Sequence, residues 1–408
     1  MNAPVTPGRR AAVIVVQGAT LVLALATARG PVRASHRAPL AETPVERFLA
    51  ERFRMTASQI AAVGRGEAVA VDLPSGVGRE IAIGGAIRVG APPDRLAALV
   101  RDIERLESGE GFQRTKKVSD PPRLEDFDDL ELPAEDVAAL RTCRPGKCDV
   151  KLGQGAFDLL RQIDWSAADA TTRVNALARR TALEYLQAYR AGGNGELAIY
   201  RDSDRPQFIA REFADMVRRT GGLPDALPEL ADYLLNYPKA SRPAGLDEFF
   251  YWSIADFGLK PVIRINHVVI CPMAGPAGTR FAIATKQLYA SHYFHTALEV
   301  RVAVDDPAQP GAAHYLVVLN MARSDGLTGL FGGIVKSKAR SGSRDGLVKA
   351  LAATKRRCEA IWLPLWPAGA LDRELTRVRW RPHDGVACWP QPVPEPDARH
   401  DGVEGSVR

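Results

Sequence analysis

The amino-acid sequence predicts an α+β fold in which an antiparallel sheet packs against a long C-terminal helix. Three observations lead to this prediction. A strand pattern from residue 79 runs into an amphipathic helix, three long strand candidates follow residue 261, and a final helix pattern covers residues 343–361. Residues 113–261 carry mostly helical patterns, so we expect them to form a large helical insertion in the α+β domain.

Composition restricts the class of protein. The 408 residues are 46% hydrophobic and 25% charged, which is ordinary for a globular chain. The formal net charge is +6 and is dispersed, and no nucleic-acid-binding motif accompanies it, so we expect no nucleic-acid partner. A mild positive excess is compatible with peripheral contact with an anionic membrane surface.

The N-terminus has the layout of a secretory signal peptide. Arg9 and Arg10 precede an apolar run, Ala11–Ala28, that ends in small residues. Residues 1–28 are predicted to be a signal peptide that is cleaved or, as the alternative, retained as an anchor, although the run falls short of the roughly 20 apolar residues that span a bilayer. Both interpretations export the rest of the chain to the periplasm or another extracytoplasmic compartment.

The first elements of the exported part follow from hydrophobic spacing. Residues 36–78 form a predicted N-terminal helical segment, with apolar residues at helix-like spacing at Phe48, Leu49, Phe53, Ile60 and Val63. Next, alternating Ile81, Ile83, Ile87 and Val89 predict a strand. Pro92 and Pro93 then begin an amphipathic helix.

The insertion contains a cysteine pair and an acidic stretch. Cys143 and Cys148 flank a Pro-Gly turn in "CRPGKC", and an oxidising compartment permits a disulfide between them. A zinc half-site is the alternative, but it lacks a second ligand cluster nearby. The acidic stretch "LEDFDDLELPAED" lacks the spacing and glycine of a calcium-binding EF-hand, so we interpret it as a solvated loop.

The C-terminal part is sheet-like. The segments "PVIRINHVVICP", "TRFAIATKQLYASHYFHTALEVRVAVDD" and "AHYLVVLN" are three strand candidates separated by Pro and Gly turns, which predicts an antiparallel meander. The predicted last helix then runs from Ser343 to Ile361. Residues 362–408 form a Pro-rich tail whose end is predicted to be disordered.

This succession resembles the START-like (SRPBCC) superfamily. The resemblance lies in the strand that leads into "APPDRLAALVRDIERL", the later run of long strands, and the closing helix "GLVKALAATKRRCEA", and it covers about residues 79–112 and 262–361. It implies a helix-grip arrangement, in which a curved antiparallel sheet grips the C-terminal helix and encloses an apolar cavity for a lipid-like ligand. Residues 79–361 would form this domain, interrupted by the helical insertion.

The candidate site lies in "KQLYASHYFHTALEV". Strand alternation puts the even-numbered residues on one, mainly apolar face, which we expect to border the cavity together with the closing helix. The predicted ligand-binding residues are those of this face and a histidine of the preceding strand: Lys286, Leu288, His292, Phe294, Leu298 and His267. Alternation sends His295 to the opposite face, so the two histidines cannot chelate one ion, and no metal site is predicted.

Three hypotheses for the function follow. The first is an exported soluble protein that binds a hydrophobic small molecule or lipid in an enclosed cavity and needs no cofactor. The second is an enzyme of the same fold that uses His292 as an acid or base, together with Lys286 or His267. The third is a structural or interaction protein of the cell envelope. Nucleophile and phosphate-loop motifs are missing from the sequence, which favours binding over catalysis.

Overall fold

The computed structural model describes residues 43–109, 111–219, 221–256, 260–273, 279–327 and 332–360. The predicted signal peptide, residues 1–28, and the Pro-rich tail, residues 362–408, lie outside the described residues. The chain divides into two units, Met1–Cys358 and Glu359–Arg408. All helices and strands that the structure describes lie in the first unit, except that the C-terminal helix ends at Glu359.

The antiparallel sheet that the sequence predicts is the centre of the fold, and it contains eight strands. The strands occur in the sheet in the order β1-β2-β10-β9-β8-β7-β6-β3, and every neighbouring pair is antiparallel. Their bounds are Val69–Asp72 (β1), Glu80–Val89 (β2), Phe112–Lys117 (β3), Asp247–Ala255 (β6), Val262–Pro272 (β7), Thr279–Ala290 (β8), Phe294–Asp305 (β9) and His314–Ser324 (β10). The first long strand, β2, therefore pairs with the last strand, β10.

One face of the sheet packs against the helices α3 (Asp94–Arg101), α4 (Ile103–Leu106) and α11 (Gly332–Glu359). This α11 side contains the apolar positions of β2 that alternation predicts, with Ile83 and Ile87 buried. Gly85 of β2 permits close contact with the helix, because a Cβ atom there would lie 2.7 Å from Leu347 of α11.

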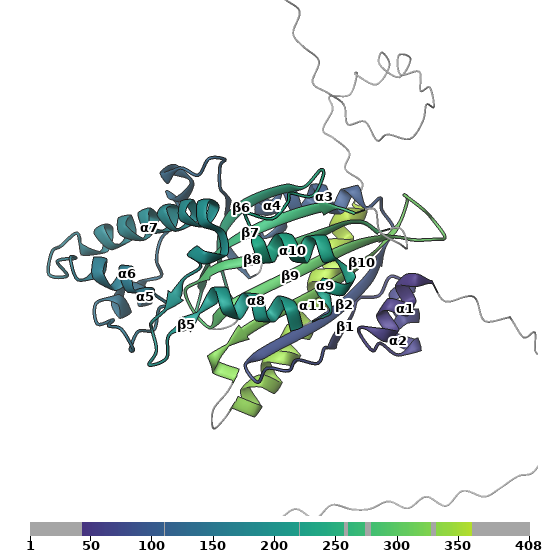
Figure 1. Ribbon diagram of the computed structural model, residues 1–408, viewed down its shortest axis with the longest axis horizontal. Coiled ribbons are helices and arrows are strands. Elements are labelled where there is room, and N and C mark those ends of the chain that lie inside the picture. The colour runs from purple at the N-terminus through teal and green to yellow at the C-terminus, as the bar shows by residue number, and fades with distance from the viewer. Residues whose placement is uncertain are drawn as a thin grey trace, which may run out of the picture. The chain divides into compact units, whose positions relative to one another are not determined.

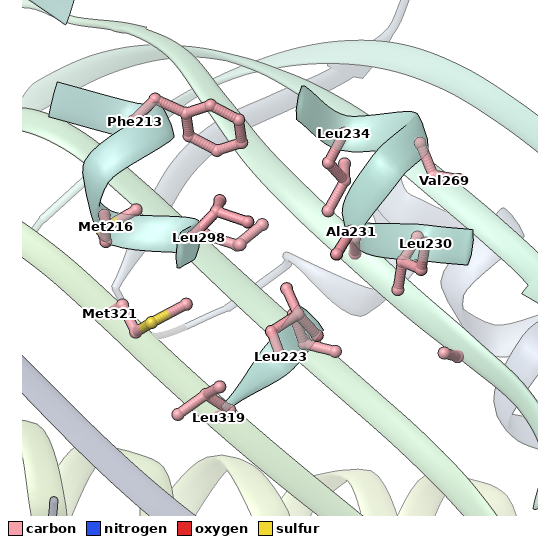
Figure 2. Close-up of a cluster of buried hydrophobic side chains, with 14 of the residues drawn as sticks. Phe213, Met216, Leu223, Leu230, Ala231, Leu234, Val269, Leu298, Leu319 and Met321 are labelled. Carbon is pink, nitrogen blue, oxygen red and sulfur yellow. The ribbon is translucent and has the colours of Figure 1, made fainter. Parts of the chain in front are cut away.

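The other face is covered by helices of the insertion and of the N-terminus (Figure 1). These helices are α1 (Pro44–Glu51), α2 (Ala57–Gly64), α7 (Ala170–Gly192), α8 (Ile209–Arg219), α9 (Leu223–Ala226) and α10 (Pro228–Asn236). Figure 2 shows apolar side chains of α8, α9 and α10, among them Phe213, Leu223 and Leu234, in one cluster with Leu298, Leu319 and Met321 of the strands. A buried ion-pair cluster adds to this contact: Arg323 of β10 pairs with Glu212 and Asp215 of α8.

The helical insertion is shorter at both ends than the predicted range 113–261. Strands β3 and β6 occupy its ends, and they pair with each other and extend the sheet. The aromatic run of β6, "DEFFYWSIA", lacks alternation because both of its faces are buried. Between these strands lie further short elements: the helices α5 (Ala134–Leu140) and α6 (Gln154–Leu160), the 3-10 turns η1 (Leu124–Phe127) and η2 (Gly193–Glu196), and the two-stranded sheet of β4 (Ile199–Tyr200) and β5 (Gln207–Phe208).

The stretch "KQLYASHYFHTALEV" is a hairpin, whereas alternation had treated it as one continuous strand. β8 ends at Ala290, Ser291–Tyr293 make the turn, and β9 begins at Phe294. Tyr293 has a φ of 56°, a left-handed conformation that reverses the chain. Residues before and after this turn therefore do not share one alternation, and His292 belongs to neither face of a strand.

Candidate functional site

Polar side chains gather on the α11 side of the central strands. The register places Asn266 beside Gln287, and Glu299 between Thr285 and Asn320, while Arg301 lies beside the buried Ile283. Paired residues share a face of the sheet, and Ile283 belongs to the core beneath α11. We call this group the polar floor; its members are Arg264, Asn266, Thr285, Gln287, Glu299, Arg301 and Asn320.

Solvent reaches the polar floor from the α11 side. Thr285, Glu299, Arg301 and Asn320 are partly exposed although they lie on central strands of the sheet. Their neighbours on the other face, such as Leu298 and Val300, are buried against the insertion. Among the α11 side chains that the structure describes, the buried ones are confined to the second half of the helix: Leu347, Leu351, Thr354 and Cys358. The first half of α11 contributes the partly buried Ala339 to the core beneath this helix.

Two amide groups of the polar floor have unused hydrogen-bond donors. Asn266 is 2% exposed and Gln287 is 5% exposed, and neither Asn266 Nδ2 nor Gln287 Nε2 has a partner among the described residues. Asn320 Oδ1, on β10, also has no hydrogen-bond partner among the described residues. A buried polar group without a hydrogen bond costs about 1–3 kcal/mol. The floor therefore has two donors and one acceptor without partners, and a polar ligand that hydrogen-bonds to them would offset this free-energy cost.

The charged groups of the floor are already paired. Arg264 Nη2 donates to Glu107 Oε2 at 2.9 Å and to Ser253 Oγ at 2.8 Å, and Arg301 pairs with Glu299 at 2.5 Å. Burial and the Glu107 carboxylate raise the pKa of Tyr251 well above its usual value, so its hydroxyl stays protonated and donates to Glu107. With each of these cations beside an acid, the floor suits an uncharged polar group better than an ion.

Two sequence-predicted residues, Lys286 and His267, lie side by side on the opposite face. They are paired in the register of β7 and β8, and Tyr189 of α7 links them. Lys286 Nζ donates to Tyr189 Oη at 3.0 Å, and it also donates to Asn194. Tyr189 Oη lies 3.3 Å from His267 Nδ1, and His267 Nε2 lies 2.8 Å from Glu248 Oε2. We call this the Lys286–Glu248 chain.

Electrostatics explain the protonation states along this chain. Burial lowers the pKa of Lys286 well below its usual value and lowers that of His267 as well, against the opposing effect of Glu248. Although burial alone would raise it, hydrogen bonds from His267, Tyr233 and Arg242 lower the pKa of Glu248 to about 2. The Glu248 carboxylate is therefore ionised at neutral pH, and burial disfavours the charged forms of Lys286 and His267.

Only the outer end of the chain reaches open space. Glu248, Tyr237 and Phe250 line a cleft of about 510 Å³ at the β3–β6 edge, which Arg190 and Asp120 border. Lys286 is 0% exposed and His267 is 1% exposed. Because neither group can meet a substrate there, we interpret the Lys286–Glu248 chain as a polar connection that holds α7 and η2 on the sheet.

His292 is occupied by structural contacts. Its Nε2 lies 2.9 Å from Asp136 Oδ1 and its Nδ1 lies 2.9 Å from the carbonyl oxygen of Asp149. Both partners belong to the insertion, and Asp136 is itself buried. His292 therefore fastens the β8–β9 turn to the insertion, and it is separate from Lys286 and His267, which the sequence had grouped with it.

The remaining predicted ligand residues are part of the protein core or its margin. Leu288 and Leu298 pack against the insertion helices, and Phe294 is partly exposed at the start of β9. The face that carries Lys286, Leu288 and Leu298 lies opposite α11, so the predicted cavity wall, made of this face and the closing helix, is wrong. On β8 and β9 the residues that face α11 are Ile283, Thr285, Gln287, Glu299, Arg301 and Ala303, whereas Tyr289, beyond the bulge in β8, packs against the insertion.

The Cys143–Cys148 disulfide is present. Among the described residues there is no group of His, Cys, Asp and Glu side chains that could hold a metal ion. Within the same residues, no helix has the length and hydropathy needed to cross a membrane.

Sequence reasoning missed the polar floor. The available signal was the presence of Asn266, Gln287 and Asn320 at positions of β-rich segments where apolar residues are usual. Comparison of the chain with protein-family models and with curated protein sequences found no match.

Proposed function

We propose that this protein is an exported binding protein with a START-like helix-grip arrangement, and that it holds a lipid-like molecule between the polar floor and α11. The arrangement is supported by β2, which runs into α3 and α4 and pairs with the last strand, and by α11, which follows that strand onto the same face. Export is inferred from the signal-like residues 1–28.

The observation that carries the proposal is the pair of unpartnered donors on Asn266 and Gln287. Two adjacent amide donors match a ligand oxygen, such as that of a hydroxyl, ester or carbonyl group. Apolar side chains adjoin the floor, since Ile83 is paired with Asn320 and Ile283 with Arg301. A molecule with one polar end and an apolar body is complementary to both regions.

Enzymatic use of His292 as an acid or base has less support. Both ring nitrogens of His292 are engaged by acceptors of the insertion, so neither is available for a reacting proton without loss of a structural contact. The polar floor, in contrast, has two buried donors without a partner among the described residues, and Thr285, Glu299, Arg301 and Asn320 beside them are partly exposed.

The test compares ligand retention between two variants. The double variant Asn266→Leu and Gln287→Met removes both unpartnered donors, so the empty protein should be at least as stable as the empty parent. The control, Gln207→Met, removes a buried amide whose Nε2 already donates to the carbonyl oxygen of Arg205. Native mass spectrometry of each protein, purified from its own envelope and extracted for lipid, measures the bound molecule.

We expect the parent and Gln207→Met to retain a lipid-like molecule and the double variant to lose it. Equal retention in the double variant would place the ligand elsewhere. A parent protein that carries no molecule and takes none from an envelope lipid extract would contradict the proposed function itself.

A further inference from the structure

A pocket of about 440 Å³ lies between the first half of α11 and β1. It is distinct from the polar floor, and it shares no residue with it. Its lining is mainly cationic and hydroxylic: Lys336, Arg340 and Arg344, Ser337 and Ser341, Gly333, and Asp72 of β1. The three cations recur every four residues, which puts them on one face of the helix.

The positive charge of this pocket is only partly compensated. Arg344 Nη1 pairs with Asp72 at 2.5 Å, and Asp72 is the one acid of the lining. Lys336 Nζ donates to the carbonyl oxygens of Val77 and Gly78, which are uncharged. Arg340 has no hydrogen bond or ion pair within the described part of the chain.

The crowding of cations has an electrostatic consequence. Burial and then the positive charge of Arg340 lower the pKa of Lys336, with Glu80 acting weakly in the other direction. The positive charges of Lys336 and Arg340 are thus held near each other in the pocket. An anion in the pocket would contact both and relieve their repulsion.

We propose that this pocket binds a phosphoryl group. Arg340 supplies an unpaired guanidinium, whose planar fork matches phosphate oxygens, Lys336 supplies a fixed ammonium, and Ser337 and Ser341 supply hydroxyl donors. The group can belong to a soluble phosphate or to the headgroup of an anionic phospholipid. Ile334 and Val335, which are 63% and 44% exposed on the adjoining helical turn, would contact the acyl layer in the second case.

The experiment uses the whole chain and two variants. Arg340→Gln removes the unpaired guanidinium, whereas Lys349→Gln removes an exposed cation of α11 outside the pocket and is the matched control. The first arm measures thermal unfolding in sodium phosphate against sodium chloride of the same ionic strength. The second arm measures binding to phosphatidylcholine vesicles with and without phosphatidylglycerol.

We expect the parent and Lys349→Gln to be stabilised by phosphate beyond the chloride effect, or to bind the anionic vesicles, and Arg340→Gln to bind about tenfold more weakly in the same arm. A response to phosphate assigns a soluble phosphate, and a response to vesicles alone assigns a headgroup. Equal responses of Arg340→Gln and the parent, an effect that chloride reproduces, or no response in either arm would overturn the proposal. The outcome is independent of ligand retention on the polar floor.

Discussion

His292 Nε2 lies 2.9 Å from Oδ1 of Asp136, and the two side chains are only 4% and 1% exposed. The contact joins the β8–β9 turn to helix α5 of the insertion. Removal of one partner leaves the other buried and unpaired, and such losses cost about 3–5 kcal/mol when the partner is charged. We expect His292→Asn and Asp136→Asn to lower the free energy of unfolding by a few kcal/mol each.

A double-mutant cycle separates this role from catalysis. Since both variants remove the same contact, the double variant should cost much less than the sum of the single variants, as measured by denaturant unfolding. Ligand retention should be unchanged in any variant that still folds. Additive costs would show that His292 and Asp136 act independently.

Lys286 predicts a pH dependence of stability. Its pKa is lower in the folded protein than the value of about 10.4 in the unfolded chain, so the unfolded state binds one more proton between these values. Stability due to this group therefore rises with pH, by at most about 1.4 kcal/mol per pH unit. The Lys286→Met protein should lose this slope and should exceed the parent in stability most clearly at pH 6.

Urea unfolding at pH 6, 8 and 10 measures the slope. Lys349→Met, at an exposed position of α11, is the control and should retain the slope of the parent. If Lys286→Met also keeps it, Lys286 is charged in the folded protein.

Glu248 predicts the opposite behaviour at acidic pH. Its pKa of about 2 in the folded protein lies below the value of about 4.3 in the unfolded chain. The carboxylate therefore stabilises the fold above about pH 4.3, and this contribution is lost as the pH falls through about 2. Glu248→Gln should cost on the order of 2 kcal/mol at pH 7 and clearly less at pH 3, as denaturant unfolding at the two pH values would show. If the cost of Glu248→Gln is the same at both pH values, the charge of the Glu248 carboxylate does not contribute to stability.

Arg323 is expected to be essential for the attachment of α8. Its guanidinium is 2% exposed and donates to Glu80, Glu212 and Asp215 at 2.6, 2.9 and 2.8 Å. Arg323→Met would leave the fully buried Glu80 without this cation, so a loss of about 3–5 kcal/mol is expected. Chemical denaturation measures it, with Arg219→Met as the control, because Arg219 pairs with Asp215 at the exposed surface of α8. Similar small costs for both variants would contradict the prediction.

Local patterns in the sequence determined several of the elements. Alternating Ile81, Ile83, Ile87 and Val89 correctly predict β2, because one residue in two of this strand faces the core beneath α11. The Pro-Gly turn between Cys143 and Cys148 correctly predicts the disulfide, because it concerns residues that are close along the chain. The α+β class, the antiparallel sheet and the long C-terminal helix follow from the order of such patterns.

Tertiary structure decided which helices cover each face of the sheet. Alternation could show that Lys286, Leu288 and Leu298 share a face, but both faces of a central strand are covered here, and the insertion helices cover this one. The turn at Tyr293 then interrupted the alternation on which the role of His292 depended. Periodicity shows which side chains share a face, whereas the packing partner of each face depends on contacts between segments far apart in the sequence, such as those of Arg323 with Glu212 and Asp215.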